Sequence, residues 1–430
     1  MKFTLSKIFV LLGLITLLGG AIYCGYRLVA LSTDRERIKE DYSLANSITF
    51  GLFSVDQWRE KISAIIDNEI EDFHITAEQK RDLQKTVEGE LHSLIGQTIR
   101  EIKKPQKSIG GKLKKLAFNI LVDSAEIQAQ VRPFAKTIVK KVGSRESEER
   151  LKEIAGSKID QLVDQIYDST KVANYRVEKF VYKKYKVTNV AAFDQQVKVK
   201  LADIKKETWQ FVYILFGCVI AALLLWFFTR KVADLKTIPF VLSLLFALTL
   251  LVTGTLVPVI EVDARISSLN LALLGDKLVF ENQVLFYQSK SVVTIVGTLI
   301  SQNKPDTIVV GALIMLFVLV LPLLRLIAKG IYVLSTKKIA RHPVIRYMTF
   351  ELGKWDMADV MVVGMLMTYI GLNGILKSQL SGLTIHTESL NVITDNGTTI
   401  QAGFFIFTFY VIFSKLLSQI LKRVSPHDKF

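Results

Sequence analysis

The sequence predicts a mainly α-helical, polytopic membrane protein with a small antiparallel β-sheet and a mostly helical domain outside the bilayer. Half of its 430 residues are apolar, and its mean hydropathy is +0.33. That value is high for a chain in which 22% of the residues are charged, unless the apolar residues are concentrated in blocks. They are, and the blocks have the length of membrane spans.

Six blocks are long enough, or nearly so, to cross roughly 30 Å of hydrocarbon as a helix of about 18 residues or more. All six lack charged residues, and the last two are slightly short but carry polar ends that can reach the interface. We predict spans at Ile8–Tyr26, Trp209–Thr229, Thr237–Ile260, Thr307–Leu324, Val360–Leu376 and Thr398–Ser414.

The first span has two interpretations. Lys2 and Lys7 precede it, as they would in a cleaved signal peptide. However, its apolar core is long, and Gly19–Cys24 offers neither a small-residue cleavage site nor a lipobox, because bulky Tyr23 precedes the cysteine. We therefore expect an uncleaved anchor, with cleavage as the alternative.

The net charge of +15 would ordinarily point to nucleic acid. The positive-inside rule explains part of the excess better, because basic residues gather in alternate short loops and after span six. These residues are Arg230, Lys231, Lys236, Lys329, Lys337, Lys338, Arg341, Arg346, Lys354, Lys422 and Arg423. We expect both termini in the cytoplasm, no nucleic-acid partner, and three segments on the far side: Ser32–Thr208, Glu261–Asp306 and Lys377–Gln401.

The segment Ser32–Thr208 is long enough to form its own core, and its pattern is helical. Val55–Ile66 and Glu148–Tyr167 place apolar residues at helical spacing, and Thr76–Gln79 looks like a capping box that opens a helix through Leu91. Acids predominate in its first part and bases in the rest. This polarity fits two halves that pack together, a face toward anionic lipid, or solvated helix faces without a partner.

Two smaller far-side segments predict β-strands. Val259–Ile266 alternates between apolar and polar residues, and Lys277–Tyr287 is rich in strand-forming residues. Leu390–Ile400 has an Asn-Gly turn between extended flanks. We expect a small antiparallel sheet on top of a helical bundle.

No motif of a common enzyme chemistry is present in the sequence. The chain lacks a phosphate loop, a dinucleotide fingerprint, H-E-x-x-H and a nucleophile elbow, and its five histidines have no metal-ligand spacing. Cys24 and Cys218 lie in apolar spans and are expected to be small core side chains rather than a disulfide or zinc site. We expect no catalysis, cofactor or metal.

Ionisable residues gather near the cytoplasmic end of the predicted bundle. Arg325 and Lys329 share a helix face after Pro322, which frees a backbone carbonyl. Asp359 enters span five and Lys415 leaves span six at that same end, so Asp359 can pair with Arg325 or Lys415. Such residues usually face the bundle interior and mark a pathway. For Lys329 and Lys415, snorkelling to the headgroups is the alternative.

Small residues form stripes on spans three and five. A stripe of this kind favours close helix packing, with a groove for a lipid tail as the alternative. The residues are Thr253, Gly254, Thr255 and Pro258 on span three, and Gly364, Thr368, Gly371 and Gly374 on span five.

Two acids lie at the start of span five. Asp356 is placed where a helix N-terminus needs an acceptor and where the helix dipole favours negative charge, and Trp355 suits the interface. Asp359 lies one turn deeper and is better explained by a basic partner.

Several of these residues resemble the signatures of the paraquat-inducible protein A (PqiA/LetA-like) family. The run Trp355-x-Met357-x-Asp359-Val360 resembles its W-x-M-x-(D/E)-V signature, and Pro322-x-x-Arg325 resembles its P-x-x-K helix end. The segment with Thr294 and Gly297 resembles the one before its second helix, and Pro258 resembles the proline that closes its first. The resemblance covers Lys231–Arg423, in the C-terminal half.

This resemblance implies an inner-membrane protein of Gram-negative bacteria, and one branch of the family implies lipid exchange with periplasmic proteins of the mammalian-cell-entry (MCE) type. Four features differ from the familiar relatives. The chain has one four-helix module instead of two, lacks zinc-ribbon cysteines, carries the added domain Ser32–Thr208, and has Arg325 in place of the usual lysine.

We therefore expect an anchor at 1–31, a helical periplasmic domain at 32–208, a transmembrane helix at 209–230, a four-helix module at 231–423 and a cytoplasmic tail at 424–430. The hypothesis is that the module binds a lipid or other amphiphile and passes it to or from a periplasmic partner in envelope lipid homeostasis. Its lipid-binding or switch residues would be Asp359, Arg325, Lys415, Thr368 and Pro322.

Two alternatives remain. One is a membrane-anchored stress or envelope scaffold whose periplasmic domain recruits partners. The other is a small-solute transporter, for which a single module gives little support because alternating access usually relies on repeats.

Overall fold

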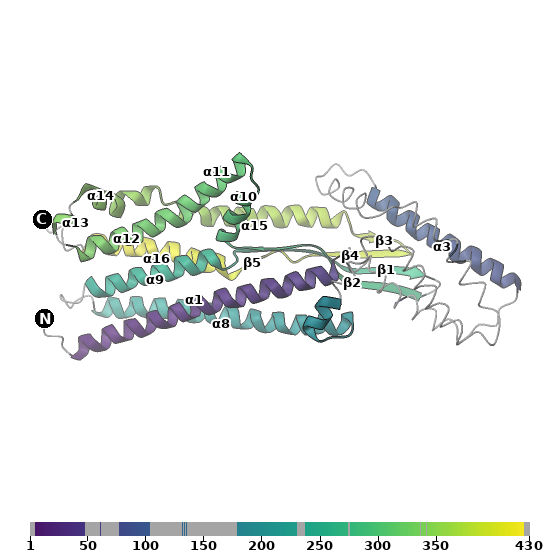
Figure 1. Ribbon diagram of the computed structural model, residues 1–430, viewed down its shortest axis with the longest axis horizontal. Helices are drawn as coiled ribbons and strands as arrows, with labels where there is room; N and C mark the ends of the chain where they lie inside the picture. The colour runs from purple at the N-terminus through teal and green to yellow at the C-terminus, as the bar shows by residue number, and fades with distance from the viewer. Residues whose placement is uncertain are drawn as a thin grey trace.

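The computed structural model describes residues 5–47, 61, 77–103, 131, 133, 135, 179–229, 237–273, 276–335, 337–340 and 342–424. In this part of the chain, a helical bundle occupies one end of a long molecule and an antiparallel sheet extends toward the other (Figure 1). Helix α1 (Leu5–Asn46) begins and α16 (Ala402–Val424) ends at the same end of the bundle. We call this the terminal end and the opposite end the sheet end.

Six helical stretches among the described residues are long and apolar enough to cross a membrane, which confirms the predicted number of spans. Their apolar cores coincide with the predicted blocks, and all the helices except α9, which ends at Leu256, are longer than predicted. Helix α1 has 42 residues and α8 (Val190–Thr229) has 40, so both continue well beyond the sheet end of the bundle. The secondary structure therefore shows no break at 32 or 208, where the sequence placed domain boundaries.

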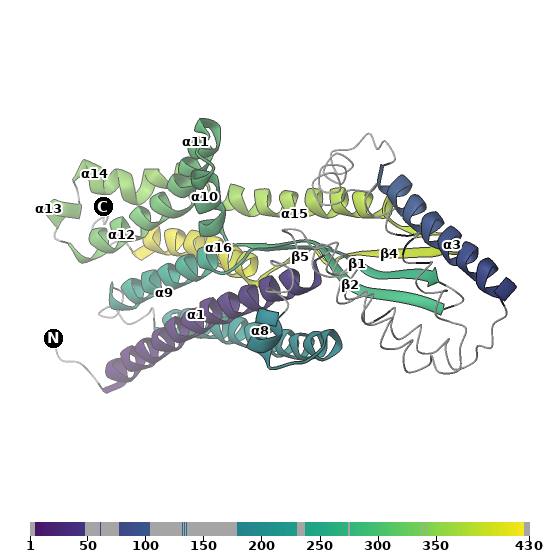
Figure 2. The same cartoon turned by 45° about the vertical axis from the view of Figure 1, so that its right-hand side comes forward.

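The extensions of α1 and α8 lie side by side in both views (Figures 1 and 2). Hydropathy does not detect them because only one face of each is apolar. Those faces meet in an aromatic cluster that also reaches the sheet, formed by Tyr42, Ala45, Val181, Tyr185, Phe193, Val197 and Val284. Its burial stabilises the helices beyond their apolar stretches.

The fourth span is a continuous helix with an altered middle. It runs through α11 (Pro305–Ile314), the π-helical η2 (Met315–Val320) and α12 (Leu321–Leu334). Pro322 lies in the first turn of α12, where its missing N–H and its ring would disturb a regular helix. The wider π-helical turn precedes this point, as is common where a helix must accommodate such a break.

The remaining helices connect these spans. Their bounds are α9 (Thr237–Leu256), α10 (Val292–Ser301), α13 (Lys337–Ala340), α14 (Pro343–Arg346), η3 (Tyr347–Glu351), η4 (Leu352–Lys354) and α15 (Ala358–Ser381). Helix α3 (Ala77–Lys103) confirms the helix predicted after Thr76, and it ends directly before Lys104-Pro105. The helices predicted at Val55–Ile66 and Glu148–Tyr167 lie outside the described residues, except for Lys61.

The sheet has the order β2-β1-β4-β3, with β5 also paired to β1; β1, β2, β4 and β5 overlap the predicted strand segments, and β3 was not predicted. Alternation along β1 separates an apolar face with Ile260 and Val262 from a face with Glu261 and Asp263. The apolar face joins the core of the bundle near β1's start and a second core under α3 farther out. The strands are β1 (Ile260–Leu273), β2 (Asp276–Lys290), β3 (Ile385–His386), β4 (Leu390–Asn396) and β5 (Thr399–Ile400).

The Asn-Gly pair does not form the predicted turn between two paired strands. Strands β4 and β5 both run antiparallel to β1, one after the other. Asn396-Gly397 therefore connects two strands that pair in turn with β1 and not with each other. The Gly397 N–H donates to the Asp263 carbonyl at 2.7 Å, which keeps the connection between β4 and β5 attached to β1. Because the pairing extends to Ile400, α16 begins at Ala402 rather than at the predicted Thr398.

The two stripes of small residues behave differently. On α9, a Cβ added at Gly254 would lie 2.8 Å from the backbone nitrogen of Phe407, so this glycine permits close contact with α16. On α15, a Cβ added at Gly364, Gly371 or Gly374 would meet nothing within 4 Å. The packing interpretation therefore holds for Gly254, whereas the α15 stripe faces away from the described parts of the chain.

Candidate functional site

A buried polar cluster lies within the apolar bundle, where α12, α16 and the start of α15 meet. The Arg325 Nη1 donates to Asp356 Oδ2 at 2.8 Å, and the Arg325 Nη2 donates to Ser418 Oγ at 3.1 Å. Lys329, one turn farther along α12, donates from Nζ to the same Ser418 oxygen at 2.8 Å. We call these four residues the Arg325 cluster.

Ser418 uses its whole hydrogen-bonding capacity in this cluster. Its oxygen accepts from both Arg325 and Lys329, and its hydroxyl donates to the Ser414 carbonyl at 2.7 Å. Tyr410 and Ser414 place two more buried hydroxyls on the same face of α16, at i−8 and i−4 from Ser418. The polar strip on α16 therefore continues from the cluster toward the middle of the bundle.

Lys329 is fully buried, with 0% of its surface exposed. The snorkelling interpretation is therefore wrong for Lys329, because its ammonium ends on Ser418 instead of reaching outward. Arg325 and Lys329 are two bases and Asp356 is one acid, so one base has no carboxylate partner among the described residues. An excess buried charge is costly in an apolar bundle and favours an anionic ligand.

The segment before α15 positions Asp356. Helices η3 and η4 lead the chain toward α12, and a Cβ added at Gly353 would lie 2.6 Å from Arg325 Nη2. The missing side chain at Gly353 thus leaves room for the guanidinium beside this turn. Asp356 Oδ1 also accepts from the Ala358 N–H at 3.2 Å, which confirms its predicted role as an acceptor at the helix start.

Asp359 pairs with a different base. Its Oδ2 accepts from Lys415 Nζ at 2.7 Å, and the two side chains are 45% and 62% exposed. The predicted proximity of Asp359 to Lys415 is thus present, but its predicted contact with Arg325 is wrong, because Asp356 occupies that position. The two acids lie about one helical turn apart. Asp356 belongs to a buried pair with Arg325, and Asp359 belongs to an exposed pair with Lys415.

The other predicted residues do not join the Arg325 cluster. Pro322 is buried one turn before Arg325 and shapes the helix, while the Thr368 hydroxyl is exposed and donates to its own helix at Gly364 O. Thr294 completes a capping box with Ser291 at the start of α10. Gly297 has open space around it, and both Trp355 and Met357 are exposed near the terminal end.

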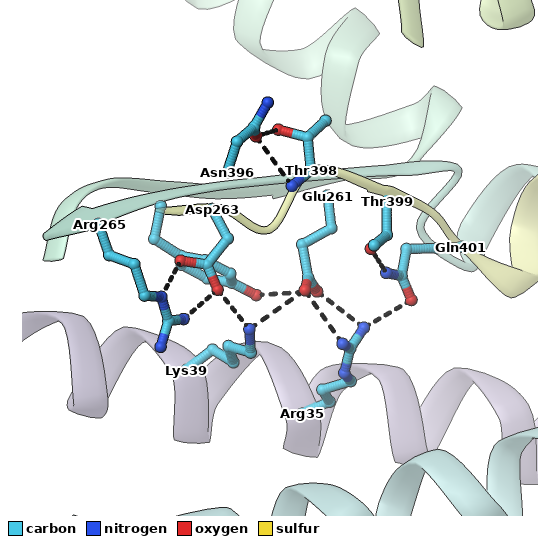
Figure 3. A network of polar contacts seen from close by, with 10 residues as sticks. Arg35, Lys39, Glu261, Asp263, Arg265, Asn396, Thr398, Thr399 and Gln401 are labelled. Carbon is cyan, nitrogen blue, oxygen red and sulfur yellow. Dashed lines mark hydrogen bonds and ion pairs between the residues drawn. The ribbon is translucent and has the colours of Figure 1, made fainter. Parts of the chain in front are cut away.

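A second polar network joins α1 to the sheet (Figure 3). Arg35 binds Glu261 with both terminal nitrogens, at 2.7 and 3.0 Å, and also donates to Gln401 Oε1 at 2.6 Å. Lys39 lies between the two acids of β1, at 3.2 Å from Glu261 and 2.7 Å from Asp263. Both acids are almost fully buried, so this network fixes α1 against the sheet.

The basic neighbours control the ionisation of this network. Burial alone raises the pKa of the Asp263 carboxyl, but Lys39 and Arg265 outweigh this effect and hold the pKa below its usual range. Burial, followed by the charge of Glu261, raises the pKa of the Tyr287 hydroxyl far above its ordinary value. Asp263 is therefore a carboxylate, and Tyr287 a neutral donor, at any physiological pH.

Sequence reasoning missed Asp356 as the partner of Arg325, and it missed Ser418 and the whole α1–sheet network. The signal for the network was present in the sequence. Glu261 and Asp263, at i and i+2, share one face of a strand, and Arg35 and Lys39, at i and i+4, share one face of a helix. Ser418 carried a weaker signal, four residues after Ser414 on an apolar helix. Among the described residues, no group of three or more His, Cys, Asp or Glu could hold a metal ion.

Comparison with known proteins gives one match. No curated protein and no solved structure matches the chain. A family model described as paraquat-inducible protein A matches residues 281–384. This range contains Arg325, Lys329 and Asp356 but not Ser418, and it includes the motif around Trp355, which confirms the resemblance in the C-terminal half. The chain is thus a membrane-type protein whose residues 281–384 match the paraquat-inducible protein A family.

Proposed function

We propose that this chain is an inner-membrane protein of the paraquat-inducible protein A type that binds an anionic lipid or amphiphile at the Arg325 cluster. It exchanges this ligand with a periplasmic partner of the MCE type and so supports envelope lipid homeostasis. The observation that carries the proposal is the excess of bases over acids in the cluster of Arg325 and Lys329, buried between apolar helices in the segment that matches the family.

The charges of the cluster favour a phosphate-bearing headgroup over a neutral amphiphile. Arg325 already holds Asp356 and Ser418, and its buried Nε has no hydrogen-bond partner among the described residues. A phosphate oxygen next to this guanidinium and to Lys329 would balance the excess charge through charge-assisted hydrogen bonds. The surrounding apolar helices suit the acyl chains of the same molecule.

The proposed orientation places the terminal end in the cytoplasm and the sheet end in the periplasm. Basic residues gather in the loops at the terminal end, whereas the two short segments at the sheet end, Glu261–Asp306 and Lys377–Gln401, carry at least as many acids as bases. In this orientation the four helices α9, α11–α12, α15 and α16 form the lipid-binding module. The sheet and the α1–α8 extensions then face a periplasmic partner.

The test compares variants of the full chain in a strain that lacks the native gene. Arg325→Ala should lose both co-purifying phospholipid and envelope-barrier function, measured by lipid mass spectrometry and sensitivity to a hydrophobic antibiotic. Arg325→Lys keeps the charge and should retain most of both. Lys415→Ala removes only the exposed pair and serves as the control, with membrane levels matched by immunoblot. Phospholipid-free wild-type protein, together with an Arg325→Ala variant that restores the barrier, would refute the proposal.

A second candidate is a membrane-anchored scaffold whose far-side domain recruits partners. The buried network between α1 and the sheet favours this candidate because it fixes the far-side helices rigidly to the bundle. Residues 32–208 fused to an unrelated membrane anchor provide the discriminating experiment. Restoration of the barrier by this fusion supports the scaffold, since the fusion lacks the Arg325 cluster altogether.

A further inference from the structure

Helix α10 runs in a different direction from the membrane spans. In both views it stands across the long axis of the molecule, whereas α1, α8, α9 and α16 run lengthwise (Figures 1 and 2). A helix that lies across helices that span the bilayer runs parallel to the membrane surface. With ten residues, α10 is about 15 Å long and could cross only about half of the hydrocarbon layer.

The contacts of α10 place its start at the boundary between the bundle and the sheet. Its N-cap residue, Ser291, directly follows the last residue of β2, Lys290. The Lys290 carbonyl accepts from the N–H of Val259, which lies just after the end of α9 at Leu256, at 2.9 Å. Helix α10 therefore begins at the level where the third span ends, which is the level of the lipid headgroups around the bundle.

The composition of α10 is typical of a segment in contact with a membrane. No residue from Ser291 to Asn303 is charged, and Lys290 and Lys304 flank this stretch. Lysines at the ends of an apolar helix can extend their long side chains to the headgroups. The capping box of Ser291 and Thr294 satisfies backbone donors at the helix start, as a helix end next to hydrocarbon requires.

One side of α10 packs against the bundle. Val292 and Val296, at i and i+4, are buried there. On the facing helix α11, a Cβ added at Gly311 would lie 3.2 Å from the Leu299 Cβ and 3.5 Å from the Val296 carbonyl oxygen. This close contact fixes α10 against the start of the fourth span.

The other two sides of α10 are exposed and differ in polarity. Val293 and Ile300, at i and i+7, form an apolar side and are 39% and 41% exposed. Thr294, Thr298 and Ser301, at i, i+4 and i+7, form an exposed hydroxyl side. Such a division suits a helix in the plane of the membrane interface, where one side meets acyl chains and another meets water.

The apolar side continues a surface that the fourth span exposes. Val309 and Val310 of α11 are 56% and 48% exposed, and they belong to a helical stretch long and apolar enough to cross the membrane. The acyl chains that cover this part of α11 therefore also reach the helix packed against it. The bilayer is thus the occupant that the surroundings of α10 favour.

We propose that α10 is an in-plane helix that binds the surface of the leaflet at the sheet end. Val293 and Ile300 insert among the upper acyl chains, the hydroxyl side faces the aqueous phase, and Lys290 and Lys304 contact lipid phosphates. This contact fixes the depth of the fourth span and of the base of the sheet. It goes beyond the proposed function and holds whichever side of the membrane the sheet faces.

The test measures the accessibility of a nitroxide spin label along α10. The full chain with Cys24→Ala and Cys218→Ala is reconstituted in vesicles of phosphatidylethanolamine and phosphatidylglycerol. The label is attached in turn at Val293→Cys, Ile300→Cys, Thr294→Cys and Thr298→Cys. Oxygen concentrates among acyl chains and a nickel chelate stays in water. The ratio of oxygen to nickel accessibility should be several-fold higher at positions 293 and 300 than at positions 294 and 298.

Two exposed positions calibrate this ratio. Ile370→Cys on the fifth span provides the lipid-facing value, and Glu388→Cys before β4 provides the aqueous value. The same ratios should be found when Arg325→Ala is added, so failure here is distinguishable from failure of the proposed function.

Three results would overturn the proposal. Aqueous values at all four α10 positions would place the helix in water, and lipid-facing values at all four would place it within the hydrocarbon. Low accessibility of Val293 and Ile300 to both reagents would mean that protein, such as a second copy of the chain, covers the apolar side.

Discussion

At the residue scale, the choice of partner for Arg325 decides which acid belongs to the interior of the bundle. Asp356 and Asp359 are three positions apart, but their side chains are 8% and 45% exposed. The difference arises because Asp356 precedes α15 and its backbone follows the turn through Gly353, whereas Asp359 is already on the helix surface. Helical periodicity could therefore place Asp359 but could not place Asp356.

The first prediction contrasts these two acids. Asp356→Asn leaves Arg325 and Lys329 buried without a carboxylate and should lower the free energy of unfolding by about 3 to 5 kcal/mol. Asp359→Asn breaks an exposed pair and should cost at most about 1 kcal/mol. Thermal unfolding of both purified variants in the same detergent measures the difference. Equal losses would mean that the two carboxylates are equally important for the fold, contrary to their burial.

At the element scale, the sequence predicted what depends on composition and missed what depends on contacts. Charge-free blocks identified the six spans because hydrocarbon excludes charge over the whole helix surface. The extensions of α1 and α8 are polar on one face, so only their packing in the aromatic cluster explains them. The strands were found from alternation, but the role of Asn396-Gly397 depended on which strand its flanks pair with.

The small-residue stripes provide the second prediction, because the same sequence pattern has opposite consequences on two helices. Gly254→Ala on α9 forces a Cβ against the backbone of Phe407 and should destabilise the protein by roughly 1 to 3 kcal/mol. Gly371→Ala on α15 meets nothing within 4 Å and should stabilise the helix by roughly 0.5 to 1 kcal/mol. Unfolding temperatures in detergent test both signs, and a destabilised Gly371→Ala variant would reveal a partner on that face.

The attachment of α1 to β1 provides the third prediction, which concerns pH. Because the pKa of Asp263 in the folded protein lies below its ordinary value of 3.8, its ion pairs contribute stability above about pH 4 that is lost as the pH falls through the lowered value. Asp263→Asn should therefore be less stable than the wild type at pH 7, and the gap should narrow toward pH 3. Glu388→Gln, at an exposed acid of the same sheet end, is the control and should show no such gap.

At the scale of the whole molecule, the arrangement separates two kinds of buried charge. The Arg325 cluster has two bases for one acid, and its Lys329 contacts a hydroxyl, whereas each of the three bases in the network between α1 and β1 contacts at least one of its two carboxylates. Breaking a buried ion pair is costly, so a network in which every base contacts a carboxylate resists rearrangement. The far-side helices therefore form a fixed frame, and the bundle is the part in which binding would change the charge balance.

The orientation of this frame in the membrane is the fourth prediction. Both native cysteines lie within the spans, so a variant with Cys24→Ala and Cys218→Ala provides a background for single labelling sites. Ser301→Cys, exposed at the C-terminus of α10 and at the sheet end of the bundle, should react with a membrane-impermeant maleimide in intact spheroplasts. His342→Cys, exposed between α13 and α14 at the terminal end, should react only after lysis, because the basic loops hold that end in the cytoplasm. The reverse labelling pattern would place the sheet in the cytoplasm, where no periplasmic protein could receive a ligand from it.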